Sequence, residues 1–318
     1  MTIKQIYQLA IDLGINADFR GKKKIDKKLS REKKIYSDLK SDEKRLFDKE
    51  RLTNPFADTR ILFGDENRKV KRILTGIDIT SGEILLADRL GQKNQKIDLI
   101  ISHHPLGKAL ARLDDVMELQ IDLLEQLGVP VNIAEGLLKK RMGEVARSVS
   151  SANHNKSVDA AKLLNIPIMC THTIADNMVA SFVQEKINSA KPEIVDDVLK
   201  VLNSIPEYQQ ASKLNAGPTL FAGSKDRRVG KIALTEITGG TSGSKDIYEK
   251  LANAGVGTII GMHMSEEYKE EAEKNHINIV IAGHMASDSL GMNLFLDQIE
   301  KKGIEIIPCS GLIRIKRW

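Results

Sequence analysis

The chain has 318 residues, of which 41% are hydrophobic, 29% charged and only 4% aromatic, a composition typical of a globular protein rather than a disordered or fibrous one. No segment approaches the roughly 20 apolar residues of a membrane helix, and the first residues predict an amphipathic helix rather than a signal peptide. Two cysteines are too few for a disulfide framework, so we expect a cytoplasmic protein without a membrane partner.

The net charge of +5 is concentrated near the N-terminus. Residues 20–51 hold 14 Lys or Arg against 7 Asp or Glu. We interpret residues 1–55 as a helical, basic N-terminal extension that ends at Asn54-Pro55. The segment is either a solvated helical hairpin or a surface for an acidic partner such as nucleic acid. Mixed charge signs and few aromatic residues favour the solvated hairpin.

From Lys71 onward, apolar runs of strand length alternate with helical stretches. The predicted strands are residues 72–80, 97–102, 166–171, 231–238, 256–263, 277–284 and 305–310. This alternation predicts an α/β fold of two similar halves, each a mixed sheet flanked by helices. We assign residues 56–180 to the first half, with a helical insertion at about 110–160, and residues 181–318 to the second. The last elements of the second half are candidates to pack back on the first.

The sequences of the two halves resemble two copies of one structural unit. Aligning the strand–helix–strand segments places Asp78 opposite Glu236 and His104 opposite His263. This favours an internal duplication, although any two βαβ units share such a pattern, so the alternative of chance likeness stays open.

Histidines gather at the ends of the predicted buried strands. Five of the seven lie there: His103, His104, His172, His263 and His284. In open α/β sheets, ligands collect beyond the carboxyl ends of the strands. Asp176 and Asp288 each follow a histidine by four residues, a spacing that places both side chains on one helix face. Imidazoles with carboxylates are the ligand set of Zn, Mn, Fe or Ni, so the pattern predicts a metal site.

Three runs carry a family resemblance: ISHHPL, HT-x-x-D and the GH-x4 run near the C-terminus. With the ILFG stretch, the IDIT strand and the Gly-rich TGGTSGS loop, they resemble the Ngg-interacting-factor-three-like proteins. That family is also called the dinuclear-metal-centre, or type-two GTP cyclohydrolase-like, family. The resemblance covers roughly residues 56–318. It implies two divalent metal ions between the halves, at the strand carboxyl ends, and a homo-oligomer that forms a hexameric ring.

By matched position, five residues look like the family's ligands: His103, His104, Asp176, His284 and Asp288. Asp288 departs from the pattern, because the family's bridging carboxylate is usually Glu, which is one methylene longer. His172 and His263 are candidates to support the ligands or to face a substrate. Gly240 and Ser242 in the Gly-rich loop join them, since such a loop either binds an anion through its N–H groups or forms only a tight turn.

The combined pattern favours a metal-dependent hydrolase that acts on a nucleotide or another phosphorylated substrate. Two divalent ions activate water near neutral pH, and Glu236 or Asp78 is the candidate catalytic general base. The alternative is a non-catalytic metal-binding or regulatory interaction protein. It needs the same ligands but no open coordination position.

Overall fold

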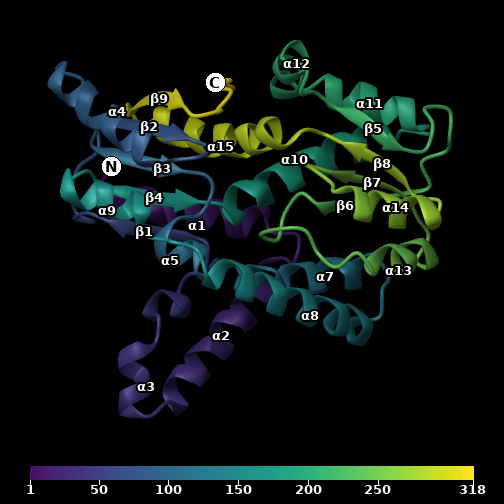
Figure 1. The fold of residues 1–318 in the computed structure, drawn as a ribbon, viewed down its shortest axis with the longest axis horizontal. Helices are drawn as coiled ribbons and strands as arrows, with labels where there is room; N and C mark the ends of the chain where they lie inside the picture. Colours follow the sequence, from purple (N-terminus) through teal and green to yellow (C-terminus); the bar gives the residue numbers. More distant parts are fainter.

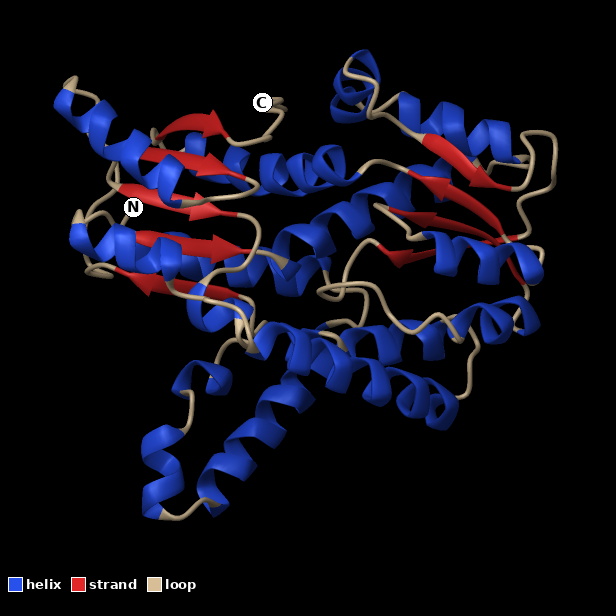
Figure 2. Cartoon of the chain, in the orientation of Figure 1, coloured by secondary structure: helices blue, strands red, loops and turns tan.

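The structure is a computed structural model that describes residues 1–318, and it contains two β-sheets flanked by helices (Figure 2). The first sheet has the strand order β1-β4-β3-β2-β9. Its strands are β1 (Thr59–Phe63), β2 (Arg72–Gly76), β3 (Leu99–Ser102), β4 (Ile168–Thr171) and β9 (Glu305–Cys309). All neighbouring strands pair in parallel except β1, which is antiparallel to β4. The predicted mixed α/β fold is confirmed.

The second sheet has the order β5-β8-β7-β6. Its strands are β5 (Thr219–Ala222), β6 (Lys231–Glu236), β7 (Val256–Gly261) and β8 (Asn278–Ile281). Strand β5 is antiparallel to β8, with an irregular register near its end, and the other pairs are parallel. The first four strands of each sheet therefore share one order and one set of directions, with β9 as an extra edge strand in the first half.

The strand registers correct one detail of the sequence alignment between the halves. The N–H of His103 donates to the carbonyl of Gly76, and the N–H of Met262 donates to that of Glu236. Glu236 therefore occupies the position of Gly76, two residues before Asp78. A Cβ at Gly76 would lie 2.8 Å from the carbonyl oxygen of Cys309 in β9. The neighbouring strand thus excludes a side chain there, whereas β6 is an edge strand with room for Glu236.

The first sheet is buried on both faces because its central strands are apolar at successive positions. Ile73 packs with α1 (Ile3–Ala17), whose Ile3 and Ile6 belong to the same core. Leu74 points to the opposite face, which α4 (Ser81–Gln92) and α9 (Lys156–Leu163) cover. Helix α1 lies in the predicted extension, but its packing makes it part of the first half.

Two long helices join the halves. Helix α10 (Thr173–Ala190) starts in the first core with Ile174 and continues into the second with Val183. Helix α15 (His284–Glu300) runs from the second core, through Leu290, back to the first. A Cβ at Gly291 would lie 2.3 Å from the carbonyl oxygen of Ala175, so the two helices approach too closely for any larger residue. Both helices begin between the two sheets.

The helical insertion covers the second sheet, although it lies within the first half of the sequence (Figure 1). It contains α5 (Gly107–Leu110), α6 (Leu113–Val116), α7 (Glu118–Gln126) and α8 (Val131–Ser150). Leu124, Leu138 and Val145 pack in one core with Ile259 and Ile279 of the second sheet. The remaining helices of this half are α11 (Val195–Asn203), α12 (Pro206–Lys213), α13 (Ile247–Asn253) and α14 (Glu266–Lys274).

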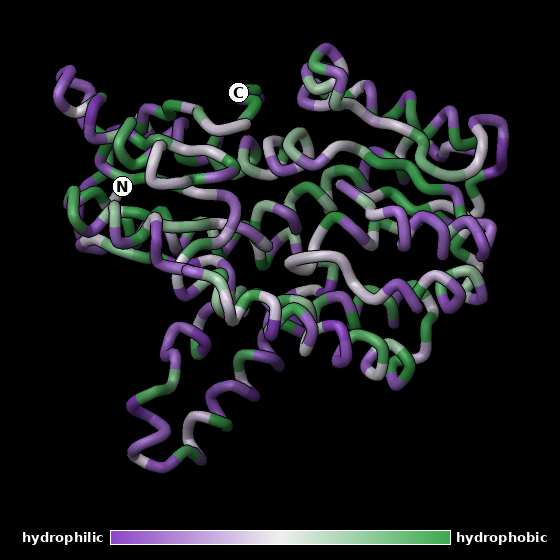
Figure 3. The backbone as a smooth tube through the Cα atoms, in the orientation of Figure 1, coloured by the Kyte–Doolittle hydropathy of each residue, from purple (hydrophilic) through white to green (hydrophobic).

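A helical hairpin projects from the body near the N-terminus (Figure 1). It consists of α2 (Lys22–Asp38), α3 (Ser41–Leu46) and the short 3-10 helix η1 (Lys49–Leu52). Hydrophilic residues dominate the hairpin (Figure 3), and Ile25 is its buried residue. No helix anywhere in the chain is both long enough and apolar enough to cross a membrane.

Candidate metal centre

Six side chains from three strand ends meet between the two halves. They are His103, His104, His172, Asp176, His284 and Asp288. The first two follow β3, the next two begin α10 after β4, and the last two begin α15 after β8. Within each of three groups, the nitrogen and oxygen atoms lie within 4.8 Å of one another. All five residues predicted as ligands are therefore in one cluster, and His172 joins them as a sixth donor.

Asp288 stands at the centre of the cluster, with one oxygen toward each of two groups. Its Oδ1 lies 3.4 Å from Nε2 of His103, which is also 3.4 Å from Oδ1 of Asp176. Its Oδ2 lies 3.4 Å from Nε2 of His104 and 3.4 Å from Nε2 of His284. Asp288 therefore belongs to two of the three donor groups.

Three of the histidines are oriented by an acceptor at Nδ1. His103 Nδ1 lies 3.1 Å from the carbonyl oxygen of Thr171. A carbonyl oxygen can only accept, so Nδ1 is the donor, and Nε2 of the neutral ring has its lone pair toward the carboxylates. His104 makes the same contact with Asp78 at 2.7 Å, and His172 makes it with Asp58 at 2.8 Å. Such outer contacts fix the tautomer in metal-binding histidines.

The unpartnered atoms at the centre fit a cation. His103 Nε2, Asp176 Oδ1 and Asp288 Oδ2 are buried without hydrogen-bond partners. Buried polar atoms rarely stay unpaired, and a nitrogen lone pair facing two carboxylates is repulsive unless a positive charge lies between them. Nitrogen and oxygen donors of this kind suit Zn, Mn, Fe or Ni. The residues present therefore match a divalent metal ion.

Protons balance the acidic charge in the ligand-free protein. Burial opposes a charged imidazole at His172, but Asp176 and Asp58 outweigh it and raise the pKa of that histidine to about 9. Burial raises the pKa of Asp176 to about 6, against the effect of His172 and His103. Burial also opposes ionisation of Asp288, yet His103 and His104 hold its pKa well below the ordinary range. Cation binding at this cluster must displace such protons.

A small cavity of about 40 Å³ opens beside the cluster. It is lined by His172, Asp176, His284 and Asp288, together with Glu236, Gly240, Ser242 and His263. The ring of His263 lies 4.8 Å from that of His284. The structure thus brings every predicted site residue to one place, with Asp78 held behind His104. The side chain of Asp78 is 58% exposed and does not line the cavity, whereas Glu236 is buried and does.

The Gly-rich loop is held over this cavity by the helical insertion. The side-chain amide of Gln120 donates to the carbonyl oxygens of Gly239, at 2.8 Å, and Thr241, at 2.6 Å. Arg141 Nε donates to the carbonyl oxygen of Ser242 at 3.2 Å. Gly239 has a φ of +103°, and a Cβ there would lie 2.6 Å from Gln120. Only glycine allows this approach, and sequence reasoning missed both contacts because the insertion is far away in the chain.

Asp58 is a site residue that sequence reasoning also missed. It is fully buried and accepts hydrogen bonds from the hydroxyl of Thr173, at 2.6 Å, and from the ring of His172. We predict that Asp58→Asn weakens divalent-cation affinity about 10–100-fold, because outer partners of histidine ligands have effects of this size. Competition with a chelating dye measures it. Asp159→Asn, on the exposed face of α9, is the matched control, and equal affinities would contradict the role of Asp58.

Ionisation of Glu236 is predicted to lower the free energy of unfolding. Burial raises the pKa of Glu236 to about 7, against opposing effects of Ser242 and Arg141. Its folded pKa exceeds the unfolded value, so its contribution favours folding at low pH and is lost as pH rises through 7. We expect Glu236→Gln to raise the unfolding free energy of the cation-free protein by about 2 kcal/mol at pH 8, and by much less at pH 5. Urea unfolding at both pH values checks this, with Glu185→Gln on the surface as control; an equal gain at both would contradict it.

Comparisons with known proteins agree with this fold. The structure of a NIF3 superfamily protein from Sphaerobacter thermophilus matches with a TM-score of 0.70 and 27% sequence identity, covering 80% of this chain and 92% of that one. Reduced HcgD from Methanocaldococcus jannaschii matches with a TM-score of 0.50 and 15% identity, covering 78% and 87%. No family model and no curated protein sequence matches the chain.

The fold and the cluster together define an α/β protein with a buried His/Asp site that could hold a metal ion. The chain is similar to the NIF3 superfamily protein in both fold and sequence, so the predicted resemblance to the Ngg-interacting-factor-three-like family is confirmed.

Proposed function

We propose that this protein is a metal-dependent hydrolase with a dinuclear centre, and that it acts on a nucleotide or another phosphorylated substrate. The observation that carries the proposal is the position of Asp288. Each of its two oxygens belongs to a separate group of nitrogen and oxygen donors, one with His103 and one with His104 and His284. One group would hold each cation, with the carboxylate between them.

The residues around the cavity supply the rest of the chemistry. Two divalent ions, when bound, would provide Lewis acidity and neutralise charge on the attacked centre. Glu236 faces the same cavity and, with a pKa near 7, is suited to take a proton from an attacking water at neutral pH. Gly240 and Ser242 at the cavity edge would contact the phosphate of the substrate through the loop that Gln120 and Arg141 hold.

The proposal is tested with metal-loaded protein and a panel of nucleotides and phosphoesters. We expect turnover, and we expect Glu236→Gln to lower kcat by about 10²–10⁴, the usual contribution of a general base. Its cation content should not change, because Glu236 is in none of the three donor groups. Absence of turnover throughout the panel, with Glu236→Gln indistinguishable from the parent protein, would contradict the hydrolase.

His172 favours a second candidate function, a metal-binding or regulatory protein without catalysis. It belongs to a donor group with His103 and His104, so a sixth ligand is available to close the coordination sphere. A closed sphere leaves no position for substrate. Water-exchange relaxation of the Mn²⁺-loaded protein separates the two functions: fast exchange supports the hydrolase, and an absence of exchanging water supports storage.

A further inference from the structure

The proposed metal chemistry does not account for the hairpin of residues 22–52, which is called the arm below. It projects from the body and takes no part in either sheet or in the metal centre (Figure 1). Its first helix, α2, places Ile25 in the body, while most of its length faces solvent. The arm is therefore fixed at its root and free along its outer side.

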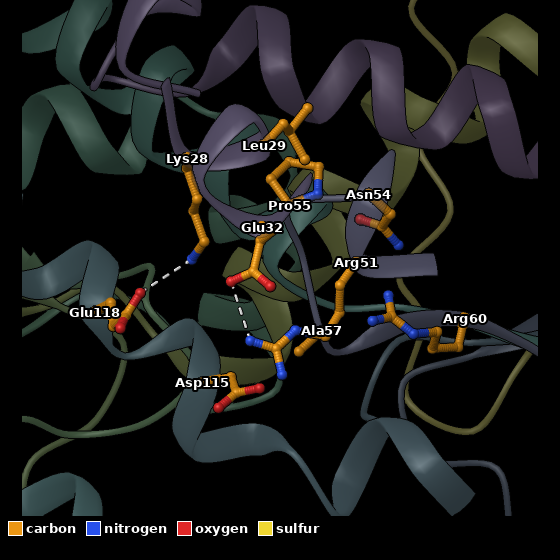
Figure 4. Close-up of a pocket in the computed structure, with 10 residues that line it drawn as sticks. All are labelled: Lys28, Leu29, Glu32, Arg51, Asn54, Pro55, Ala57, Arg60, Asp115 and Glu118. Atoms are coloured by element: carbon orange, nitrogen blue, oxygen red, sulfur yellow. Dashed lines mark hydrogen bonds and ion pairs between the residues drawn. The ribbon is translucent and has the colours of Figure 1, made fainter. Parts of the chain in front are cut away.

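Ion pairs on the inner side fix the root. Lys28 contacts Glu118 of α7 at 3.2 Å, and Glu32 contacts Arg51 at 3.0 Å (Figure 4). Lys24 lies 3.0 Å from Asp122 and 2.9 Å from Glu125, also on α7. The inward cations Lys24 and Lys28 are thus paired with acids of the body.

The outer side of α2 carries cations without partners. Six exposed residues there form no ion pair: Lys22, Lys23, Lys27, Arg31, Lys33 and Lys34. Two acids, Asp26 and Asp38, lie on the same side. At 100° per residue, Lys23, Lys27, Arg31 and Lys34 fall within about 80° of the helix circumference and form a stripe about 16 Å long. The stripe is therefore positively charged over a length that spans several phosphates of a nucleic-acid backbone.

We propose that the outer face of α2 binds the sugar–phosphate backbone of double-stranded nucleic acid without sequence preference. Duplex DNA carries one negative charge per about 1.7 Å of axis, so a 16 Å stripe faces roughly ten phosphates. Straight helices with regularly placed cations match such a backbone, and flexible Lys side chains tolerate small mismatches in spacing.

The other acidic partners fit this face less well. A membrane surface or an acidic peptide is held through several apolar anchors beside the charges. The stripe itself contains none, only exposed Ile35 borders it, one turn after Arg31, and exposed Leu46 lies on α3. Single strands are held by bases stacked on aromatic rings. The rings of Tyr36 and Phe47 pack against each other instead, with centroids 5.0 Å apart and planes tilted by 50°. Contacts to a duplex backbone require neither feature.

The test is fluorescence anisotropy of the full chain with a labelled 24-base-pair DNA duplex and with an RNA duplex of the same length. If each of the four cations of the stripe contacts one phosphate, the affinity for the duplex should fall about 100-fold between 50 and 200 mM salt. We expect the quadruple variant K23Q/K27Q/R31Q/K34Q to lose most of the affinity and most of the salt dependence, while circular dichroism and cation content stay unchanged.

The matched control is K93Q/K96Q/K301Q/K302Q, which removes the same charge from four exposed, unpaired lysines on the body. This control is expected to bind the duplex like the parent protein. Equal losses in the two quadruple variants, or full binding by the arm variant, would overturn the proposal. So would binding to phosphatidylserine vesicles or to single strands in preference to the duplexes.

Discussion

Asp288→Asn is expected to abolish binding of the cation pair. The two carboxylate oxygens lie in separate donor groups, at 3.4 Å from His103 and at 3.4 Å from His104 and His284. An amide leaves one oxygen and replaces the other with an N–H donor that cannot ligate a cation. We expect more than 100-fold loss of affinity, beyond the roughly 10–100-fold typical of outer partners. Metal analysis of protein loaded and then gel-filtered measures the stoichiometry.

Two companion variants make this experiment decisive. Asp288→Glu restores the longer carboxylate that the family resemblance implies at this position, and it should keep both cations. Asp226→Asn, on an exposed loop, should bind like the parent protein. If Asp288→Asn retained two cations per chain with unchanged affinity, Asp288 would not be the ligand that the two groups share. If Asp288→Asn lost only one, the remaining amide oxygen would still serve one group, and the expected loss of both cations would be wrong.

The ligands could be predicted from sequence because each lies in a strongly patterned segment. Continuous apolar runs predict buried strands, and a parallel sheet aligns their carboxyl ends, which places His104 near His172. The i, i+4 spacing then places Asp176 and Asp288 in the same cluster. Oδ2 of Asp176 lies 3.7 Å from Nε2 of His172, and Oδ2 of Asp288 lies 3.4 Å from Nε2 of His284. Short-range periodicity and one general property of α/β sheets were sufficient to predict this cluster, whereas the choice of five ligands within it came from the family resemblance.

The supporting residues could not be predicted in the same way. Asp58 reaches His172 only because β1 is antiparallel to β4, with Thr59 opposite Thr171. Nothing near Asp58 in the sequence indicates this pairing. Gln120 similarly reaches the Gly-rich loop from an insertion that packs on the other half. Both contacts depend on which distant elements pack together in the tertiary structure, and local sequence patterns do not indicate this.

The alignment of the halves failed by two residues for a related reason. Matching letters placed Asp78 opposite Glu236, but the registers place Gly76 there. The first half has an additional neighbour, β9, which returns from the end of the chain and leaves no room for a side chain at Gly76. The second half lacks this neighbour, so Glu236 can face the cavity. A strand contributed by the C-terminus therefore determines which half carries the acid.

The C-terminal tail leads to the second large expected effect. After β9 the chain crosses α15 and reaches α12, where the guanidinium of Arg317 donates to Glu207 at 2.6 Å. Glu207 is fully buried, and its other donor is Asn293 at 2.8 Å. We expect Arg317→Met to lower the free energy of unfolding by about 3–5 kcal/mol, because it leaves a buried carboxylate without its counter-charge. The fall in Tm should be about 5 °C.

A double-mutant cycle separates the buried charge from the loss of contact area. Glu207→Gln combined with Arg317→Met removes both charges, so the double variant should recover at least half of the stability lost by Arg317→Met alone. Arg228→Met, on an exposed loop, is the control for removing an arginine, and it should have no effect. If the double variant were as unstable as Arg317→Met, packing of the tail rather than the carboxylate would account for the loss. The tail connects β9 of the first sheet to Glu207 on α12 of the second half. In that case packing, and not the ion pair, would hold the tail across the two halves.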